Sequence, residues 1–400
     1  MANEKEEMGL DRRGFLKAAG LAGVGLAGCL AGSLSGCATA ETPKPDIAAS
    51  LSAIKTEPVV YPQLPYNKVS APKEGCLVGL YKERQSGIDP VAAAKNKEML
   101  AKAKNIDEYA DMLRKENFFD STDKETPIGN NITHYEKSLS AKPFIFVLGD
   151  TPRLYSGFPT RESKRLAKSG IVPYINARPG SHVMTHLRFT LEELARGKRD
   201  NYIKEFAKSA AEFGKEHGGF FMTTMEESNG NWYYWGQNRD FVPAWRNIWQ
   251  IFEDQGANQY ATWVWETYCV EANPSNVRDP EQFYPGDKYV DWIGLSAFAK
   301  RKYPTTDGPF DSQISKTCER MRKLSPQKPI MQAEFGKTNA YDQPKWLNDA
   351  YKSIKQDFPA IKAAIQWDNV SPDGDDHTLS PKSLQAMKEI FKDPYWIMAK

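Results

Sequence analysis

Cysteine is scarce in this chain, and neither sign of charge prevails. Five cysteines among 400 residues are too few for a disulfide scaffold at this length. The 53 basic and 51 acidic residues leave a net charge of +2, which gives no electrostatic case for a nucleic-acid binder. Apolar residues at 40% and charged residues at 26% lie near the globular norm and exclude wholesale disorder. The length fits two ordinary domains or one large α/β barrel.

The apolar stretch near the N-terminus is short. Ala18–Gly36 is only weakly apolar, too short for a stable membrane span and rich in glycine, which is a poor helix former. The segment before it, Asp11–Lys17, reads Asp-Arg-Arg-Gly-Phe-Leu-Lys and is typical of a twin-arginine export signal. We therefore expect residues 1–37 to be an export signal that takes no part in the fold.

The end of this signal resembles a bacterial lipobox. Leu34–Cys37 reads Leu-Ser-Gly-Cys, and Leu26–Cys29 is a second match upstream. Cys37 is favoured because a polar, proline-bearing stretch follows it directly. We expect cleavage before Cys37 and lipidation of its thiol, which would attach the protein to a membrane by the lipid alone, in the periplasm or at the cell surface. The alternative is an ordinary cleaved signal without lipid.

Residues 38–75 carry repeated prolines and few sustained apolar patterns. This composition predicts a tether between the membrane and a folded domain of residues 76–400, with part of the tether able to pack on the domain surface.

Within residues 76–400, eight short apolar runs alternate with longer amphipathic stretches. Most of the runs are continuously apolar, as is typical of parallel strands buried on both faces. This pattern favours an α/β fold, a single (β/α)8 TIM barrel, over an open doubly wound sheet. The runs are Cys76–Tyr81, Phe144–Gly149, Ile171–Asn176, Gly219–Met225, Tyr260–Trp265, Trp292–Phe298, Pro329–Phe335 and Ala363–Trp367.

Acidic residues stand where two of these runs end. Glu226 and Glu227 follow the fourth run, and Glu334 lies at the end of the seventh. A barrel gathers the C-terminal ends of its strands at one mouth, so these carboxylates are expected to face each other there. Two opposed carboxylates are the minimum apparatus for cleaving a glycosidic bond. Aromatic residues beside them can stack on sugar faces.

The stretch Glu227–Gly236, Glu-Ser-Asn-Gly-Asn-Trp-Tyr-Tyr-Trp-Gly, is similar to the acid/base motif of glycoside hydrolase family 26. Tyr284–Gly294 and Lys328–Gly336 match further parts of the family, and the resemblance covers most of residues 76–392 in order. It implies a (β/α)8 barrel and a retaining, endo-acting β-glycanase, with Glu227 as general acid/base and Glu334 as nucleophile. No metal or organic cofactor is signalled.

Further residues near the strand ends are expected to bind substrate. Glu226 stands where the family has a histidine, and it could form a salt bridge or bind a sugar hydroxyl. Phe298, with Tyr303 beyond it, is nearest to a tyrosine that the family places after strand six, next to the nucleophile. The predicted substrate-binding set is Glu226, Asn229, Trp232, Trp235, Trp265, Phe298 and Trp367.

The resemblance implies a double displacement, with the two carboxyl groups about 5–5.5 Å apart. Like charges at that separation resist simultaneous ionisation, so we expect a raised pKa for Glu227 and an ionised Glu334. A bell-shaped pH profile centred below neutrality would follow.

The expected partner is a polysaccharide or oligosaccharide, acted on by a monomer. β-Mannan is the leading substrate, followed by β-1,3-xylan, β-glucans and an exopolysaccharide of the host cell. The chief alternative is a non-catalytic carbohydrate-binding lipoprotein on the same scaffold; a purely structural lipoprotein is a third.

Overall fold

The computed structural model describes residues 60–82, 98–115, 127–149, 154–180, 186–299, 308–339, 342–371 and 374–400. The expected export signal, with Cys29 and Cys37, lies outside these residues, as does Tyr303.

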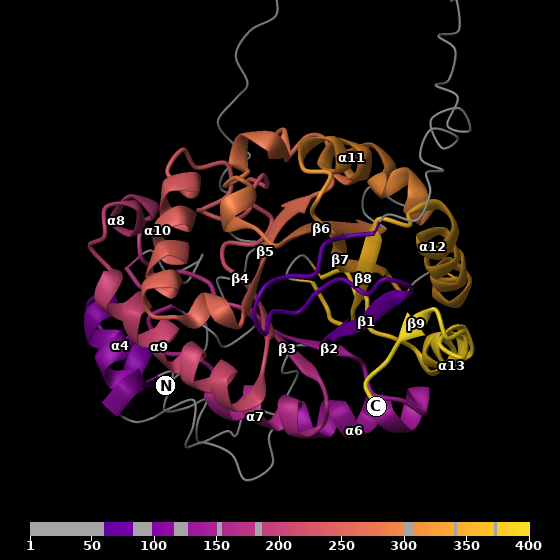
Figure 1. Ribbon diagram of the computed structural model, residues 1–400, viewed down its shortest axis with the longest axis horizontal. Coiled ribbons are helices and arrows are strands. Elements are labelled where there is room, and N and C mark those ends of the chain that lie inside the picture. The colour runs from indigo at the N-terminus through magenta and orange to yellow at the C-terminus, as the bar shows by residue number, and fades with distance from the viewer. Residues whose placement is uncertain are drawn as a thin grey trace, which may run out of the picture.

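Eight parallel strands close into a barrel, and a ring of helices surrounds them (Figure 1). Closure is direct, because β1 pairs with both β2 and β8. The (β/α)8 TIM barrel is therefore confirmed. The strands are β1 (Cys76–Tyr81), β2 (Ile145–Leu148), β3 (Val172–Asn176), β4 (Phe220–Thr223), β5 (Ala261–Tyr268), β6 (Trp292–Ala299), β7 (Ile330–Lys337) and β8 (Ile361–Trp367).

All eight apolar runs are strands, with differences at their ends. The largest difference is in β5, which continues to Tyr268, three residues beyond the expected end at Trp265. A ninth strand, β9 (Trp396–Ile397), pairs with the start of β1. It has two residues, too few for any periodic pattern in the sequence.

The helices present their apolar faces to the barrel. In α9 (Asp200–His217) the buried residues include Ile203, Phe206, Ala210 and Phe213, the stripe that its 3.6-residue period predicts. None of the helices in the described ranges is both long and apolar enough to cross a membrane. The other α-helices are α4 (Ile106–Lys115), α6 (Pro127–Leu139), α7 (Thr160–Lys168), α8 (Leu191–Ala195), α10 (Phe241–Asp254), α11 (Phe310–Leu324), α12 (Gln343–Asp357) and α13 (Pro381–Ile390), and the 3₁₀ helices are Ala257–Gln259, Val270–Ala272, Pro280–Phe283 and Asp287–Tyr289.

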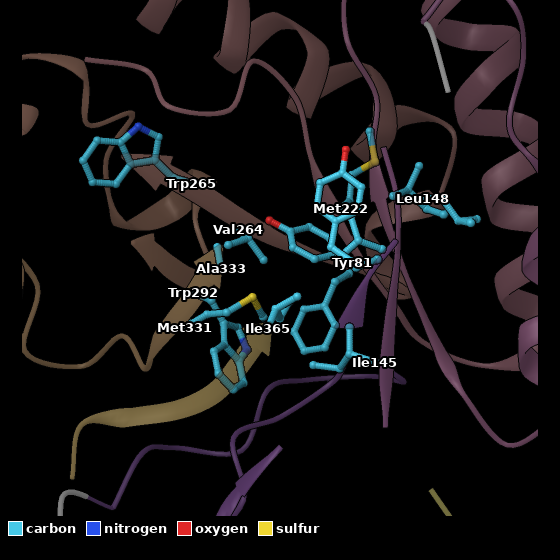
Figure 2. Packing of buried hydrophobic residues seen from close by; sticks show 14 of the residues in the cluster. Tyr81, Ile145, Leu148, Met222, Val264, Trp265, Trp292, Met331, Ala333 and Ile365 are labelled. Carbon is cyan, nitrogen blue, oxygen red and sulfur yellow. The ribbon is translucent and has the colours of Figure 1, made fainter. Parts of the chain in front are cut away.

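The barrel interior is filled by side chains rather than open. A Cβ added to Gly79 would lie 2.7 Å from Cγ1 of Ile365 and 3.2 Å from Cβ of Ile145, so these strands approach too closely for a larger residue. Figure 2 shows Ile365 and Ile145 close to Tyr81 in this interior. The packed floor leaves the C-terminal ends of the strands as the place for a site.

Residues 60–75, part of the expected tether, pack against the barrel. Lys68 forms an ion pair with Asp291 at 2.8 Å, and both side chains are largely buried. The backbone N–H of Val69 donates to Oγ1 of Thr262 at 2.7 Å. These contacts hold the segment at the start of β5 and β6.

Asp291→Ala tests how strongly this segment is held. The carboxylate accepts hydrogen bonds from Lys68 and from the backbone N–H of Trp263, so its loss leaves both donors without this partner. We expect the free energy of unfolding in urea to fall by about 2–4 kcal/mol. Lys345→Ala, which breaks an exposed ion pair with Asp349, should change it by less than about 0.5 kcal/mol. Equal effects of the two changes would contradict this role of the pair.

Candidate active site

The turn after β4 has an unusual backbone. Met225 and Glu227 both have left-handed φ angles, 57° and 50°, although neither is glycine. Such residues cost about 1–3 kcal/mol each and persist only where the surrounding structure holds them. Here the left-handed residues turn the chain sharply at the end of β4, at the mouth of the barrel.

Asn229 is the main support of this turn. It is fully buried, and its amide donates to the carbonyl oxygens of Tyr268 and Arg278, both at 2.9 Å. Its Oδ1 accepts from the backbone N–H of Tyr268 at 2.8 Å. These three hydrogen bonds use both N–H groups and the oxygen of the buried amide, so the expected role in substrate binding is corrected: Asn229 joins the turn to the end of β5.

Trp235 is a second support. Its indole has no exposed surface, stacks on Tyr233 with ring centroids 4.3 Å apart, and donates to the carbonyl oxygen of Glu226 at 2.8 Å. A ring with no exposed surface cannot stack on a sugar, so the prediction that Trp235 contacts substrate is also corrected.

Trp232 does reach the acid group. Its Nε1–H donates to Oε2 of Glu227, and its half-buried ring packs edge-on against Tyr268. A Cβ at Gly230 would lie 2.4 Å from the Trp232 ring, so glycine is needed there for the indole to take this position. Trp232 therefore both orients the Glu227 carboxyl and keeps part of its own surface accessible.

Glu226 forms the salt bridge that was one of its two interpretations. Its Oε1 accepts from Nε of Arg178 at 2.6 Å, and the glutamate side chain is 1% exposed. Arg178 follows β3 and lies over the ring of Tyr233, 5.6 Å from the centroid. Oε2 of Glu226 is buried without a hydrogen-bond partner among the described residues, so the structure favours the salt bridge over the expected contact with a sugar hydroxyl.

A fourth glutamate, Glu266, lies beneath this group and was missed by the sequence analysis. Its carboxyl is buried and accepts hydrogen bonds from Ser296 at 2.6 Å and from Tyr174 at 3.2 Å. Its position directly follows Trp265, where the apolar run was expected to end. The longer β5 turns Glu266 inward, because neighbouring residues of a strand face opposite sides.

The carboxylates are close enough to affect one another's titration. Burial, followed by the charges of Glu266 and Glu227, raises the pKa of Glu334 well above its usual range. Burial also raises the pKa of Glu266 to about 8, with the charges of Glu227 and Glu226 adding to the effect. The expectation that Glu334 ionises readily is therefore corrected. It considered two carboxylates, whereas the barrel brings four together.

Phe298 and Trp367 form an aromatic edge of the mouth. Their ring centroids are 5.2 Å apart, and each also contacts His377, a fully buried histidine that the sequence analysis did not identify. Both aromatic residues keep 7% of their surface exposed. The structure thus brings Phe298 and Trp367 to the same end of the barrel as the carboxylates.

Trp265 lies elsewhere. It has no exposed surface and packs against Tyr284, with ring centroids 5.0 Å apart. Figure 2 draws it well apart from Tyr81 and Ile365 in the barrel interior. Its expected role as a substrate contact is corrected, and the reason is strand alternation: Glu266 faces inward, so Trp265 faces outward.

A buried ion pair stands beside the aromatic edge. Asp368 accepts from Lys82 at 3.0 Å, from the backbone N–H of Leu379 at 2.8 Å, and from the hydroxyl of Tyr135. The pair joins the ends of β1 and β8 and thereby fixes the backbone next to Trp367.

No group of three or more metal-ligating side chains within the described ranges is arranged to hold a metal ion. The described cysteines, Cys76, Cys269 and Cys318, are buried free thiols, and none of the three forms a disulfide bond. Burial raises the pKa of the Cys318 thiol to about 12.

The relationship to known proteins agrees with this geometry. Residues 192–397, more than half of the 400 residues, match the sequence model of glycosyl hydrolase family 26. The chain belongs to this family. The family 26 match includes the turn after β4 and strands β5 to β8, which carry all four glutamates.

Individual relatives of this family 26 chain are distant. Endoglucanase H of Acetivibrio thermocellus is 28% identical over 210 residues, covering 49% of this chain and 22% of that protein. A mannan endo-1,4-beta-mannosidase A and B of Caldalkalibacillus mannanilyticus is 23% identical over 185 residues, covering 44% and 31%. The chain thus spans less than a third of the length of these relatives. The GH26 β-mannanase BoMan26A of Bacteroides ovatus shares the fold, with a TM-score of 0.54 and 15% identity over 82% of this chain and 91% of that one.

Asn229→Ala tests the supporting role of this side chain. The change removes three hydrogen bonds and strands a buried N–H, so the free energy of unfolding should fall by about 2–3 kcal/mol in urea titrations. Asn231→Ala is the matched control, because Asn231 is exposed and its side chain bonds to Asn276 alone among the described residues. It should stay within about 0.5 kcal/mol of the unchanged protein. An Asn229→Ala protein with the same free energy of unfolding as the unchanged protein would contradict this supporting role.

Proposed function

We propose that this protein is a retaining endo-β-glycanase that hydrolyses a β-linked polysaccharide, with β-mannan as the leading substrate. The observation that carries the proposal is that Glu227 follows β4 and Glu334 lies near the end of β7, so that both stand at the same mouth of the barrel, and the charge of Glu227 contributes to the raised pKa of Glu334. Family membership supports the same reaction class.

The proposed reaction has two displacements. The Glu334 carboxylate attacks the anomeric carbon while Glu227 protonates the departing glycosidic oxygen, which breaks the C–O bond and forms a glycosyl ester. Glu227, now a carboxylate, removes a proton from water, and that water releases the sugar from Glu334 with net retention. Trp232 holds the acid group through its indole N–H throughout.

The remaining side chains would position the sugar. The exposed edges of Phe298 and Trp367 offer apolar surface for sugar C–H groups. Trp367 is the proposed floor of the central subsite.

Charge argues for a neutral glycan. The site brings four glutamates together. Among the described residues, Arg178 is a cation that lowers the pKa of Glu334. A negatively charged sugar beside these carboxyls would further oppose the ionisation of Glu334 that attack requires, so an acidic exopolysaccharide is the least suitable substrate. β-Mannan, β-glucan and β-1,3-xylan are neutral, and proteins named for acting on mannan and on β-1,3-xylan are among the relatives. We propose that the protein acts on them as a monomer.

Glu334→Ala tests the reaction. Removing the nucleophile should lower kcat/KM on oligosaccharides roughly 10⁴-fold or more, and Glu227→Ala roughly 10²–10⁴-fold, with circular dichroism unchanged. Glu212→Ala, at an exposed position of α9, should retain full activity. Products from a panel of neutral β-glycans would be identified by mass spectrometry, and NMR of the first-formed anomer should show retention. Near-normal hydrolysis by Glu334→Ala, or an inverted anomer, would rule out the double displacement.

A second candidate function is glycan binding without hydrolysis. Phe298 stands nearest to the place where the family has a tyrosine, and within the described part of the chain Glu334 receives no hydrogen bond. Binding of glycans with no product formed at any pH would favour this function over the hydrolase.

We also propose export by the twin-arginine route and lipidation at Cys37, supported by the sequence alone. Cys37→Ser should abolish labelling by a fatty-acid probe and release the protein from membranes, because the lipid would be its anchor. Cys29→Ser is the matched control and should remain labelled. Loss of labelling in Cys29→Ser but not in Cys37→Ser would place the lipid on Cys29. If the unchanged protein carries no label either, the segment is an ordinary cleaved signal without lipid.

A further inference from the structure

Glu266 occupies the layer of the barrel directly below the proposed catalytic pair. In the strand register, Glu266 pairs with Gly294 of β6, and Ser296 of β6 pairs with Glu334 of β7. Ser296 donates to Glu266, so a single β6 residue lies between the buried carboxyl and the proposed nucleophile.

Hydrogen bonds are unequal between the two carboxyls. Glu266 accepts from the hydroxyls of Ser296 and Tyr174, which favours its anionic form. No hydrogen bond to Glu334 is donated by the described residues, and the charge of Arg178 favours its anion. When Glu266 and Glu334 together lose their first proton, these hydrogen bonds favour the negative charge on Glu266.

The groups facing this pair come from several strands. Tyr174 of β3 and the β4 turn residues Glu226 and Glu227 face Glu266. Near Glu334 lie Tyr174, Tyr233 and Arg178, of which the two tyrosines have a pKa raised by burial and so remain neutral. Glu226 is neutralised by its ion pair with Arg178, and Glu227 would hold a proton as the acid. Glu334 must therefore ionise next to a negatively charged Glu266, which makes its ionisation less favourable.

We propose that Glu266 is a positioning residue that controls the charge of the nucleophile Glu334, so that glycan cleavage is suppressed in acid and develops toward neutral and alkaline pH. The role goes beyond the cleavage reaction itself, although its effect on catalysis rests on the proposed function. The raised pKa values of both carboxyls agree with it and replace the expected optimum below neutrality.

Attack on the anomeric carbon requires the ionised form of Glu334, and this requirement sets the direction in which the pH profile shifts. A neighbouring anion raises the pKa of Glu334, so less of it is ionised at any pH below that value. Glu266→Gln removes the charge while keeping size and polarity. The acid limb of the kcat/KM profile should therefore move to lower pH by at least about one unit, which is about tenfold more activity at a fixed pH on that limb.

Two further variants separate this role from a loss of packing. Glu271→Gln is the matched control: Glu271 also accepts a backbone N–H and a hydroxyl, both from Thr317, and lies outside the cluster. Its profile should be unchanged. Ser296→Ala removes one donor from Glu266 and should shift the acid limb in the same direction as Glu266→Gln, by a smaller amount.

Infrared titration of the unliganded protein tests the same control without any substrate. In a Glu227→Gln background, the protonated-carboxyl band would be followed between about pH 4 and about pH 9. Adding Glu266→Gln should remove one titrating group and move the remaining one to lower pH. A remaining group that keeps its midpoint, or an acid limb that stays in place in Glu266→Gln, would overturn the proposal. A correct infrared shift in a protein that cleaves no glycan would instead overturn the proposed function alone.

Discussion

Negative charge gathered in a buried place is the constraint on which this site depends. Glu226, Glu227, Glu266 and Glu334 come from three elements and share one barrel mouth, where burial raises the pKa of both Glu266 and Glu334. Arg178 offsets one of them through its ion pair with Glu226. Any chemistry at the mouth therefore depends on which carboxyl keeps its proton, and the neighbouring hydroxyls bias that choice.

The acid-bearing turn shows how the fold holds such a group in place. A backbone with two left-handed residues would relax if left alone, but it is tied down by a fully buried asparagine. The ties lead to the end of β5, which also carries Glu266, and Ser228 N–H donates to the Glu266 carbonyl at 3.1 Å. The acid group and the buried glutamate beneath it are thus parts of one hydrogen-bonded unit.

Much of the fold could be predicted, because its evidence is local. Strands of a closed parallel barrel are buried on both faces, so each one appears in the sequence as a continuous apolar run. Glu227 and Glu334 stand out for the same reason, as acids at the ends of such runs. Glu266 could not be separated in this way, since it lies inside a strand whose true end is three residues later than the apolar pattern indicated. Only the pairing of β5 with β6 shows that it faces inward.

Periodicity and motifs contiguous in the chain were enough to predict the barrel, to recognise the family resemblance and to propose the two catalytic glutamates. The tertiary structure decided which polar and aromatic side chains support the site and which face it. Asn229 and Trp235 bond to the protein itself, and Trp265 faces away from the barrel interior. Glu266 and Arg178 belong to the site although the sequence analysis did not identify them. Several of these interactions join residues far apart in the chain, as in the 30-residue separation of Glu266 and Ser296 and the 48-residue separation of Arg178 and Glu226, and no local pattern encodes them.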